Sequence, residues 1–403
     1  MRALLEESFR AAVAAADPLR ILPPHLPPPP RGRTFVAAAG KAAASMALAV
    51  ERHWPRDAPL DGLAITRYGH GLPTRRIRVL EAGHPVPDAA GESGARALLA
   101  GVRALGPEDL LLALISGGGS SLLSLPAEGV TMERLKAMTR ELLRCGAPIQ
   151  EINTARKHLS AIQGGRLAAA CRAPVLALVI SDVTGDDPTH IASGPCAPDP
   201  TTVADARGVL AKYGIAPPGP FTETPKPGDR LFARVENRVV ATARRSLEAA
   251  AALFEARGIA PTILGDDITG EAREVARDMA AQARVAPRPS VLISGGECTV
   301  TVRGKGGRGG RCGEFLLALA LALDGVPGVH AIAADTDGID GSEDNAGAVI
   351  SPDTLARAAG RRLDARAHLE AHESYGFFSA LGDLVVTGPT RTNVNDYRAI
   401  LLA

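Results

Sequence analysis

The chain has 403 residues, and its 45 lysines and arginines nearly balance 44 acidic residues, which leaves a formal net charge of +1. This balance and an aromatic share of 3% give neither a basic field nor many stacking platforms, so no nucleic-acid partner is expected. The five cysteines form no CxxC pair, which argues against a disulfide framework or a zinc site and favours a reducing, cytoplasmic compartment. A chain of this length predicts two domains.

The apolar segments are too short to predict membrane insertion. The run FLLALALAL at residues 315–323 has about half the length that a transmembrane helix needs. Glu6 and Glu7 interrupt the amphipathic N-terminal stretch where a signal peptide would be apolar. No membrane partner is therefore expected.

Strands and helices alternate along the first half of the chain. The expected buried strands are 33–40, 110–116 and 173–182. Continuous apolar strands between amphipathic helices, among them one helix expected over 153–171, predict a doubly wound, Rossmann-like parallel sheet covered on both faces. The Pro/Gly-rich segment 214–230 is the best candidate for a boundary, so domains are expected at 1–230 and 231–403, the second also α/β.

The sequence changes character near residue 290. Residues 290–303, SVLISGGECTVTVR, predict two strands of a hairpin, and the loop GKGGRGGR follows at 304–311 before a helix. Its backbone N–H groups and cations predict a polyphosphate cradle made of Gly304, Lys305, Gly306, Arg308 and Gly309. The same glycines match the dinucleotide-binding pattern G-x-G-x-x-G. A dinucleotide-binding site is disfavoured because the preceding strand is predicted to be one arm of a hairpin and no suitable acidic residue follows.

Polar residues follow each predicted parallel strand, at the strand ends where ligands collect in open α/β sheets. Gly40 and Lys41 follow the first strand at a helix N-terminus and predict an anion site, with a surface lysine after a turn as the alternative. The second strand ends in a loop whose backbone N–H groups and hydroxyls can surround an anion, with a flexible linker as the alternative. That loop comprises Ser116, Gly117, Gly118, Gly119, Ser120 and Ser121.

Carboxylates follow the third strand. Asp182 is the first charge beyond it, and Asp186 and Asp187 come next. Such groups can hold Mg²⁺ or accept a proton from a hydroxyl, although a helix-capping turn would suit Asp186 or Asp187 as well. The helix expected nearby places Arg156, Ser160 and Gln163 near one face, and its His158 is expected to be structural.

Two further polar segments lie near the C-terminus. The segment ADTDGIDG places Asp335, Asp337 and Asp340 after a predicted strand, where they can bind a metal or cap turns. The segment TGPTRTNVND at 387–396 is dense in hydrogen-bonding groups and either binds a small polar ligand or forms a structural turn. Cations, glycine-rich loops and carboxylates together suit phosphoryl transfer.

These motifs resemble those of the class II glycerate 2-kinases over nearly the whole chain, from about residue 4 to 402. The matching stretches are AAAGKAA, LISGGGSSLL, RKHLSAIQGGRLA, SDVTGDDPTHIASGP, ISGGECTVTVRGKGGRGGR, DTDGIDG and TGPTRTNVND. The resemblance implies an N-terminal glycerate-kinase domain, a C-terminal MOFRL domain at about 288–400, and an active site in the cleft between them. It also implies ATP- and Mg²⁺-dependent phosphorylation of D-glycerate at its 2-hydroxyl. Family members have often carried the label hydroxypyruvate reductase, from a tartrate-operon setting.

The resemblance also implies residue roles. Lys41 and Arg311 correspond to the principal active-site cations, which clamp the glycerate carboxylate and the transferred phosphate, and Asp182 to the catalytic base. The implied substrate- and phosphate-binding residues are Ser116, Gly117, Gly118, Gly119, Ser120, Arg156, Glu314, Asn393, Asn395 and Asp396. The implied nucleotide-binding residues are Gly304, Lys305, Gly306, Arg308 and Gly309. The implied magnesium ligands are Asp182, Asp187 and Asp337.

The chain departs from the family pattern at three positions. Cys312 and Gly313 replace the usual Asn and Gln, and Gln163 replaces a Lys. Two alternatives therefore stay open, namely an NAD(P)H-dependent hydroxypyruvate reductase and a non-catalytic protein that binds glycerate or nucleotide. No motif marks an adenine sub-site, and a homodimer is one possible assembly.

Overall fold

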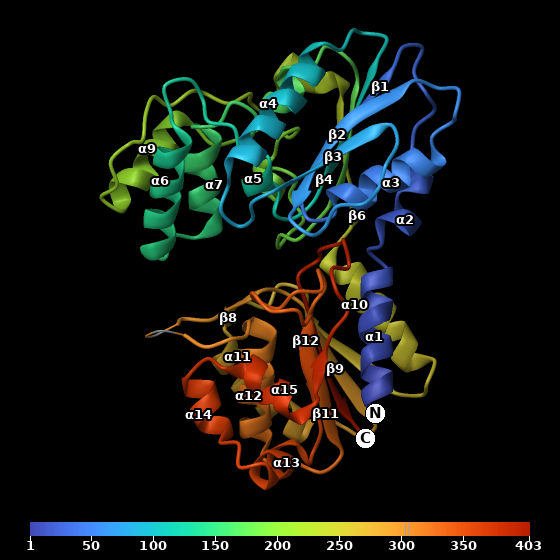
Figure 1. The fold of residues 1–403 in the computed structure, drawn as a ribbon, viewed down its shortest axis with the longest axis vertical. Helices are drawn as coiled ribbons and strands as arrows, with labels where there is room; N and C mark the ends of the chain where they lie inside the picture. The colour runs from blue at the N-terminus through green and yellow to red at the C-terminus, as the bar shows by residue number, and fades with distance from the viewer. Residues whose placement is uncertain (303, 305) are drawn as a thin grey trace. The chain divides into compact units, whose positions relative to one another are not determined.

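The computed structural model describes residues 1–302, 304 and 306–403. The chain forms two compact units: Pro18–Val240, here the N-terminal unit, and Met1–Asp17 with Ala241–Ala403, here the C-terminal unit (Figure 1). This division differs from the expected domains 1–230 and 231–403 in two respects, since the N-terminal unit extends to Val240 and the first 17 residues belong to the C-terminal unit. Among the described residues, no helix combines the length and the apolar composition needed to cross a bilayer.

The N-terminal unit is built on a six-stranded sheet with the order β3-β2-β1-β4-β5-β6. Its strands are β1 Thr34–Ala39, β2 Leu60–Arg67, β3 Ile77–Ala82, β4 Leu110–Ile115, β5 Val175–Ile180 and β6 Val235–Ala241. The pairings from β3 through β5 are all parallel. Every residue of β1, β4 and β5 is buried, so the expected buried strands of a parallel sheet are confirmed.

Helices cover both faces of this sheet, with α3 and α4 on opposite sides in Figure 1. The helices of this unit are α2 Pro18–Ile21, α3 Ala43–His53, α4 Ala89–Arg103, α5 Gly119–Leu122, α6 Met132–Arg144, α7 Ile149–Lys157, α8 Arg166–Ala169 and α9 Val203–Lys212. The short 3-10 turns are η1 Pro23–His25, η2 Ile191–Ser193 and η3 Arg230–Arg234. A separate apolar cluster joins α6, α7 and α9 beside the main core.

The single helix expected over 153–171 is wrong. Helix α7 ends at Lys157 and α8 begins at Arg166, because Gly164 and Gly165 adopt positive φ angles of 60° and 79°. Ser160 lies in the connecting turn, where its hydroxyl accepts hydrogen bonds from two backbone N–H groups. Arg156, Ser160 and Gln163 therefore do not share a helix face.

The C-terminal unit has a six-stranded sheet with the order β13-β12-β11-β14-β9-β7. Its strands are β7 Ala260–Gly265, β9 Ser290–Ser294, β11 Val329–Asp335, β12 Gly347–Ile350, β13 Leu384–Val385 and β14 Asp396–Leu402. Only β7 and β9 pair in parallel among these strands, and the other pairings are antiparallel. This unit is therefore α/β with a mixed sheet.

The hairpin expected over 290–303 is also wrong. Strand β9 pairs with β7 and β14, whereas β10 (Cys298–Thr299) pairs in parallel with β8 (Gly270–Glu271) in a small separate sheet. The chain turns away at Gly296, which has a φ of 96° and packs so closely on the backbone of Ile268 that a Cβ would collide with it. Gly295 and Gly296 thus lie where the chain passes from one sheet to the other.

Two helical layers cover the mixed sheet (Figure 1). The helices of this unit are α1 Arg2–Ala14, α10 Ala243–Glu255, α11 Ala272–Val285, α12 Arg311–Leu323, α13 Thr354–Gly360, α14 Ala365–Glu370 and α15 Ser374–Leu381. Helices α1 and α10 pack on one face of the sheet, and α11, α12 and α15 pack on the other.

Burial of α1 explains why the N-terminus belongs to this unit. Its apolar stripe, Leu5, Phe9 and Ala12, is buried in the same cluster as Phe254 of α10. The Phe9 ring lies 6.0 Å from the ring of Tyr397 in β14, and the Tyr397 hydroxyl donates a hydrogen bond of 2.7 Å to the Ser8 hydroxyl. Apolar burial, which sequence periodicity alone cannot assign to a partner, therefore fixes α1 here.

We predict that Phe9→Ala destabilises the C-terminal unit by about 3–5 kcal/mol, because it removes a buried ring and leaves a cavity. Urea denaturation followed by far-UV circular dichroism measures the loss. The sole tryptophan, Trp54, is buried in the N-terminal unit, so its fluorescence transition should not move. The exposed neighbour Arg10→Ala is the control, with a change within about 0.5 kcal/mol. Equal effects of the two variants would contradict this packing.

Candidate active site

Three of the predicted loops begin at one edge of the N-terminal sheet. Strands β1 and β4 pair so that Ala39 lies opposite Ile115, and Ile115 lies opposite Val179 of β5. Because the three strands are parallel and end at the same level, the loops that follow them emerge side by side. The structure thus brings together the segments that carry Lys41, the serine–glycine loop and Asp182.

Ser116 holds this edge together instead of facing a ligand. Its backbone N–H donates to the Ala39 carbonyl at 3.0 Å, and its hydroxyl accepts from the Ala42 N–H at 3.1 Å. The side chain is fully buried. Gly40 has a φ of 128°, and a Cβ there would collide with the Ser116 hydroxyl, so only glycine fits.

Lys41 and His84 flank the middle of the glycine loop. The Lys41 N–H donates to the Gly117 carbonyl at 2.8 Å. A Cβ on Gly118, which has a φ of 78°, would lie 2.9 Å from His84 Nε2 and 3.2 Å from Lys41 Cγ. The sequence reasoning missed His84. His84 was predictable by the same argument as the other loops, because it follows the carboxyl end of a parallel strand, β3.

A chain of side-chain hydrogen bonds links the loop to Arg156. The hydroxyls of Ser120 and Ser193 lie 2.8 Å apart, and the Ser193 hydroxyl donates to Asn153 Oδ1 at 3.1 Å. The Arg156 guanidinium donates to the same oxygen at 3.2 Å. Gln163 braces the loop by donating from its side-chain amide to the Ser120 carbonyl at 2.8 Å. Asn153 and Ser193 are buried and were not predicted, since their segments join only in the fold.

Among the described residues, Arg156 has no carboxylate partner, and it keeps its positive charge. Burial lowers the pKa of its guanidinium to about 10, and no carboxylate opposes that shift. The group therefore remains a cation at neutral pH. A half-buried cation whose contact is a neutral amide is suited to bind an anionic ligand.

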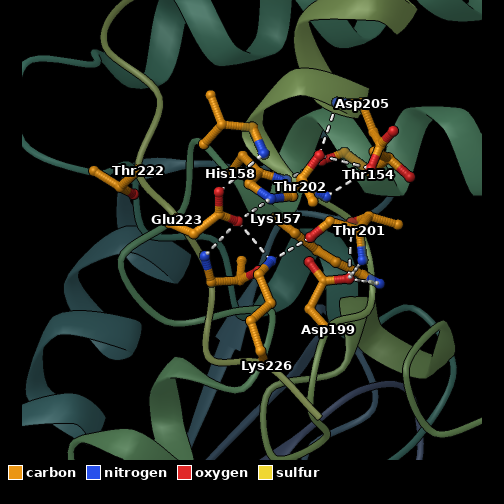
Figure 2. A network of polar contacts seen from close by, with 12 residues as sticks. Thr154, Lys157, His158, Asp199, Thr201, Thr202, Asp205, Thr222, Glu223 and Lys226 are labelled. Carbon is orange, nitrogen blue, oxygen red and sulfur yellow. Dashed lines mark hydrogen bonds and ion pairs between the residues drawn. The ribbon is translucent and has the colours of Figure 1, made fainter.

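The adjacent residue Lys157, in contrast, belongs to a network of polar contacts, which Figure 2 shows. Its ammonium lies 3.3 Å from Asp199 Oδ1, and both side chains are almost fully buried. Burial lowers the pKa of Lys157, and the Asp199 carboxylate opposes that effect. Next to it, His158 bonds to the Thr154 carbonyl and to the carboxylate of Glu223, as expected for a structural histidine. This network (Figure 2) fixes the end of α7.

The predicted magnesium ligands lie in different surroundings. Asp182 is half-buried, and Asp187 is exposed with one carboxylate oxygen accepting from the Thr189 N–H at 2.8 Å. Asp337 belongs to the C-terminal unit, is almost fully buried and accepts from the Ile339 N–H. Among residues 1–302, 304 and 306–403, no cluster of three or more histidine, cysteine or acidic side chains is arranged to hold a metal.

Arg311, which was expected to be an open clamp, is surrounded by carboxylates. It contacts Asp335 at 2.6 Å, Asp396 at 2.8 Å and Glu297 at 3.1 Å. Burial opposes the charge, but these carboxylates raise the pKa of Arg311 well above its usual range. Asp396 also pairs with the buried Arg398 at 2.8 Å. The charge of Arg311 is thus compensated by carboxylates, of which that of Glu297 is exposed.

The segment 387–396 is bonded to the turn that follows β11. The Thr390 N–H donates to the Asp337 carbonyl at 3.0 Å, and the Thr336 hydroxyl donates to the Asn395 carbonyl at 2.6 Å. Asn393 and Asn395 are buried. These contacts favour a structural role for the segment, and ligand binding by its two asparagines stays a prediction.

Gly309 and Gly310 of the loop 304–311 pack against protein, whereas a Cβ on Gly304 would meet nothing within 4 Å. A Cβ on Gly309 would collide with the Ser374 hydroxyl, and a Cβ on Gly310 with the Asp340 carboxylate. Arg308 donates to the Glu373 carboxylate from its backbone N–H at 2.8 Å and from its guanidinium at 3.0 Å. Gly304 and Gly306 have positive φ angles, and the predicted nucleotide ligand Lys305 lies outside the described residues. Close packing therefore explains Gly309 and Gly310 without a bound phosphate, but it does not explain Gly304.

Asp340 caps the N-terminus of α12, where a phosphate was expected. Its two carboxylate oxygens accept from the Cys312 N–H at 3.0 Å and the Gly313 N–H at 2.8 Å. Burial raises the pKa of Asp340 to about 6, although these hydrogen bonds oppose the shift. Glu314, predicted to bind substrate, is buried and pairs with Arg273 and His372. Glu314 and His372 line a cavity of about 240 Å³ in the C-terminal unit, together with Arg311.

Comparisons with known proteins agree with the motifs. The family described as "Domain of unknown function (DUF4147)" matches residues 4–222, and the MOFRL family matches residues 290–396. An Agrobacterium vitis protein named "Putative hydroxypyruvate reductase" is 52% identical, covering 100% of this chain and 94% of its own. The D-glycerate 2-kinase of Thermotoga maritima is 38% identical, covering 98% and 97%. A crystal structure of glycerate kinase from T. maritima superposes with a TM-score of 0.87 at 37% identity, covering 100% and 99%.

The parallel sheet, its loops and these relatives define an α/β phosphotransferase. The chain belongs to the glycerate kinase family, in which a DUF4147 domain and a MOFRL domain occur together. The family resemblance of the motifs is thereby confirmed.

We predict that Asp340 makes the C-terminal unit less stable as the pH rises. The pKa of its carboxyl is higher in the folded than in the unfolded state, so its contribution is full below about pH 4 and is lost as the pH rises through about 6. The free energy of unfolding of the wild type, relative to Asp340→Asn, should fall by on the order of 3 kcal/mol between pH 4 and 7. Urea titrations across this range measure it. Asp278→Asn, exposed on α11, is the control. If the difference in unfolding free energy between the wild type and Asp340→Asn does not change with pH, the burial of Asp340 is contradicted.

Proposed function

We propose that this chain transfers the γ-phosphoryl group of ATP to the 2-hydroxyl of D-glycerate and forms 2-phosphoglycerate. The observation that carries the proposal is the edge of the N-terminal sheet, where Lys41, the loop Gly117–Ser120 and the uncompensated cation Arg156 are held together. Relatives named glycerate 2-kinase or D-glycerate 2-kinase, at 38% identity, supply the substrate and the position of transfer.

The cations of this edge bind the two anions of the reaction. Lys41 and Arg156 hold the glycerate carboxylate and the transferred phosphoryl group, because both demand positive charge in a site with little water. Asp182, the first carboxylate beyond β5, orients the 2-hydroxyl and accepts its proton. Positioning of the 2-hydroxyl next to the phosphoryl group further increases the rate of phosphoryl transfer.

Mg²⁺ and ATP are the proposed cofactors, and the residues present fit them in part. The half-buried Asp182 and the exposed Asp187 offer the hard oxygen ligands that Mg²⁺ prefers in proteins. Asp337 fits less well, because it is buried and already accepts a backbone hydrogen bond. The bound ion neutralises charge on the phosphoryl group. Backbone N–H groups of Gly304, Gly306 and Gly309 remain the proposed nucleotide contacts.

The reductase alternative is less well supported. In a dinucleotide-binding site the glycine pattern follows a core parallel strand and opens a helix whose N-terminus receives the pyrophosphate. Here the preceding strand is the two-residue β10, and Asp340 already caps α12. The name hydroxypyruvate reductase among the relatives nevertheless justifies a direct test.

We predict that the purified chain releases ADP from ATP and Mg²⁺ only when D-glycerate is present. Coupling to enolase, which accepts 2-phosphoglycerate directly, identifies the position of transfer. In parallel, NADH and NADPH with hydroxypyruvate should show no oxidation above background. Nicotinamide oxidation without ADP release would replace the kinase by the reductase, and binding of glycerate without turnover would leave a non-catalytic protein.

We predict that Lys41→Ala lowers kcat/KM for D-glycerate at least 100-fold, because it removes a cation that stabilises the transferred group. Lys136→Ala on α6 is the matched control and should keep full activity. Arg156→Ala tests the second proposed cation and should also lower kcat/KM for D-glycerate, because it removes a cation that contacts the neutral amide of Asn153. Undiminished turnover of Lys41→Ala would remove its proposed role.

A cytoplasmic location and assembly as a homodimer are also proposed. The relatives of this chain are enzymes that act on small molecules. Light scattering coupled to gel filtration tests the assembly by mass.

A further inference from the structure

The chain of hydrogen bonds from Arg156 to Ser120 has a fixed direction. Arg156 can only donate, so the atom of Asn153 that it contacts is the oxygen Oδ1 and not the amide nitrogen. Ser193 lies 3.1 Å from that same oxygen and therefore directs its single hydroxyl proton there. The contact of 2.8 Å between the Ser193 and Ser120 hydroxyls then needs a proton from Ser120.

Ser120 is consequently an acceptor toward any ligand. Its only hydroxyl proton is committed to Ser193, and its remaining lone pairs cannot stabilise a carboxylate or a phosphate oxygen. They can accept a hydrogen bond from a hydroxyl group. Ser120 is only partly buried, unlike Ser116, Ser193 and Asn153, so it is the member of the chain that a ligand can reach.

Backbone strain holds this arrangement in place. Ala192 and Ser193 have φ angles of 51° and 59°, a left-handed conformation that is unfavourable for residues with a side chain. The strained turn packs on the start of α5, where a Cβ on Gly119 would lie only 2.5 Å from the Ala192 Cβ. This close approach brings Ser193 within reach of Ser120. Such strain persists where surrounding structure demands it, often at functional sites.

We propose that Ser120 accepts a hydrogen bond from the 3-hydroxyl of the substrate and thereby selects glycerate over 3-deoxy acids. The proposal rests on the proposed function, in which Lys41 and Arg156 take the anions and Asp182 takes the reacting 2-hydroxyl. The 3-hydroxyl is then the one donor of glycerate without a partner. An oxygen held as an acceptor is suited to this donor, and Arg156 sets the direction through Asn153.

The test compares D-glycerate with D-lactate, which lacks only the 3-hydroxyl, on the full-length protein. In the wild type, kcat/KM should favour D-glycerate by at least about 10-fold, the typical value of one hydrogen bond in a site. Ser120→Ala should lose most of this preference by a fall for D-glycerate alone. Ser120→Thr, which retains the oxygen, should keep the preference. Ser124→Ala, a neighbour whose hydroxyl lies against the Met132 sulfur, is the control.

Two further variants separate this role from a structural one. Asn153→Asp gives Arg156 a carboxylate partner and preserves the acceptor oxygen, so it should raise KM for both acids and leave their ratio unchanged. Ser193→Ala frees the hydroxyl proton of Ser120 and should lower the ratio of kcat/KM for D-glycerate to that for D-lactate. This variant keeps the proposal testable if Ser120→Ala fails to fold. Dissociation constants from calorimetry give the same ratio when D-lactate is turned over too slowly to measure.

Equal losses for both acids in Ser120→Ala, or an unchanged ratio in Ser120→Ala or Ser193→Ala, would overturn the proposal. Failure of the wild type to phosphorylate D-glycerate is a different result. It would refute the proposed function, whereas a working kinase with an unchanged ratio would refute only the role of Ser120.

Discussion

The parallel pairing of β1 with β4, and of β4 with β5, is the constraint on which the candidate site depends. It brings three loops to one edge of the sheet, and the Ser116 hydroxyl then locks two of them together. Gly40 and Gly118 allow this because their positive φ angles and tight contacts leave no room for a side chain. The position of Lys41 is thus a consequence of sheet register and of two glycine turns.

Charge compensation decides which cations can serve a ligand. Arg156 and Lys157 are neighbours at the end of α7, yet Lys157 pairs with the Asp199 carboxylate, whereas Arg156 donates to the neutral amide of Asn153. In the C-terminal unit, Arg311 meets three carboxylates. Arg156 therefore offers its positive charge to a ligand, whereas three carboxylates compensate the charge of Arg311.

The sequence predicted the features that depend on local patterns. The buried strands β1, β4 and β5 are recognisable as apolar runs, and the loops after them as polar and glycine-rich segments. Features set by non-local contacts were not predictable. The separation of β9 from β10 and the docking of α1 on Tyr397 both depend on partners far away in the chain. The same holds for the carboxylates around Arg311 and for Asn153 and Ser193. The break after Lys157 has a local cause, the positive φ angles of Gly164 and Gly165.

The central claim is that the carboxyl edge of β1, β4 and β5 binds the acid and the transferred phosphate. A crystal structure with bound 2-phosphoglycerate tests it most directly. The account predicts electron density for the ligand beside the loop 117–120, with its carboxylate and phosphate in contact with Lys41 and Arg156. A ligand bound in the C-terminal unit alone, with neither cation in contact with it, would contradict the account.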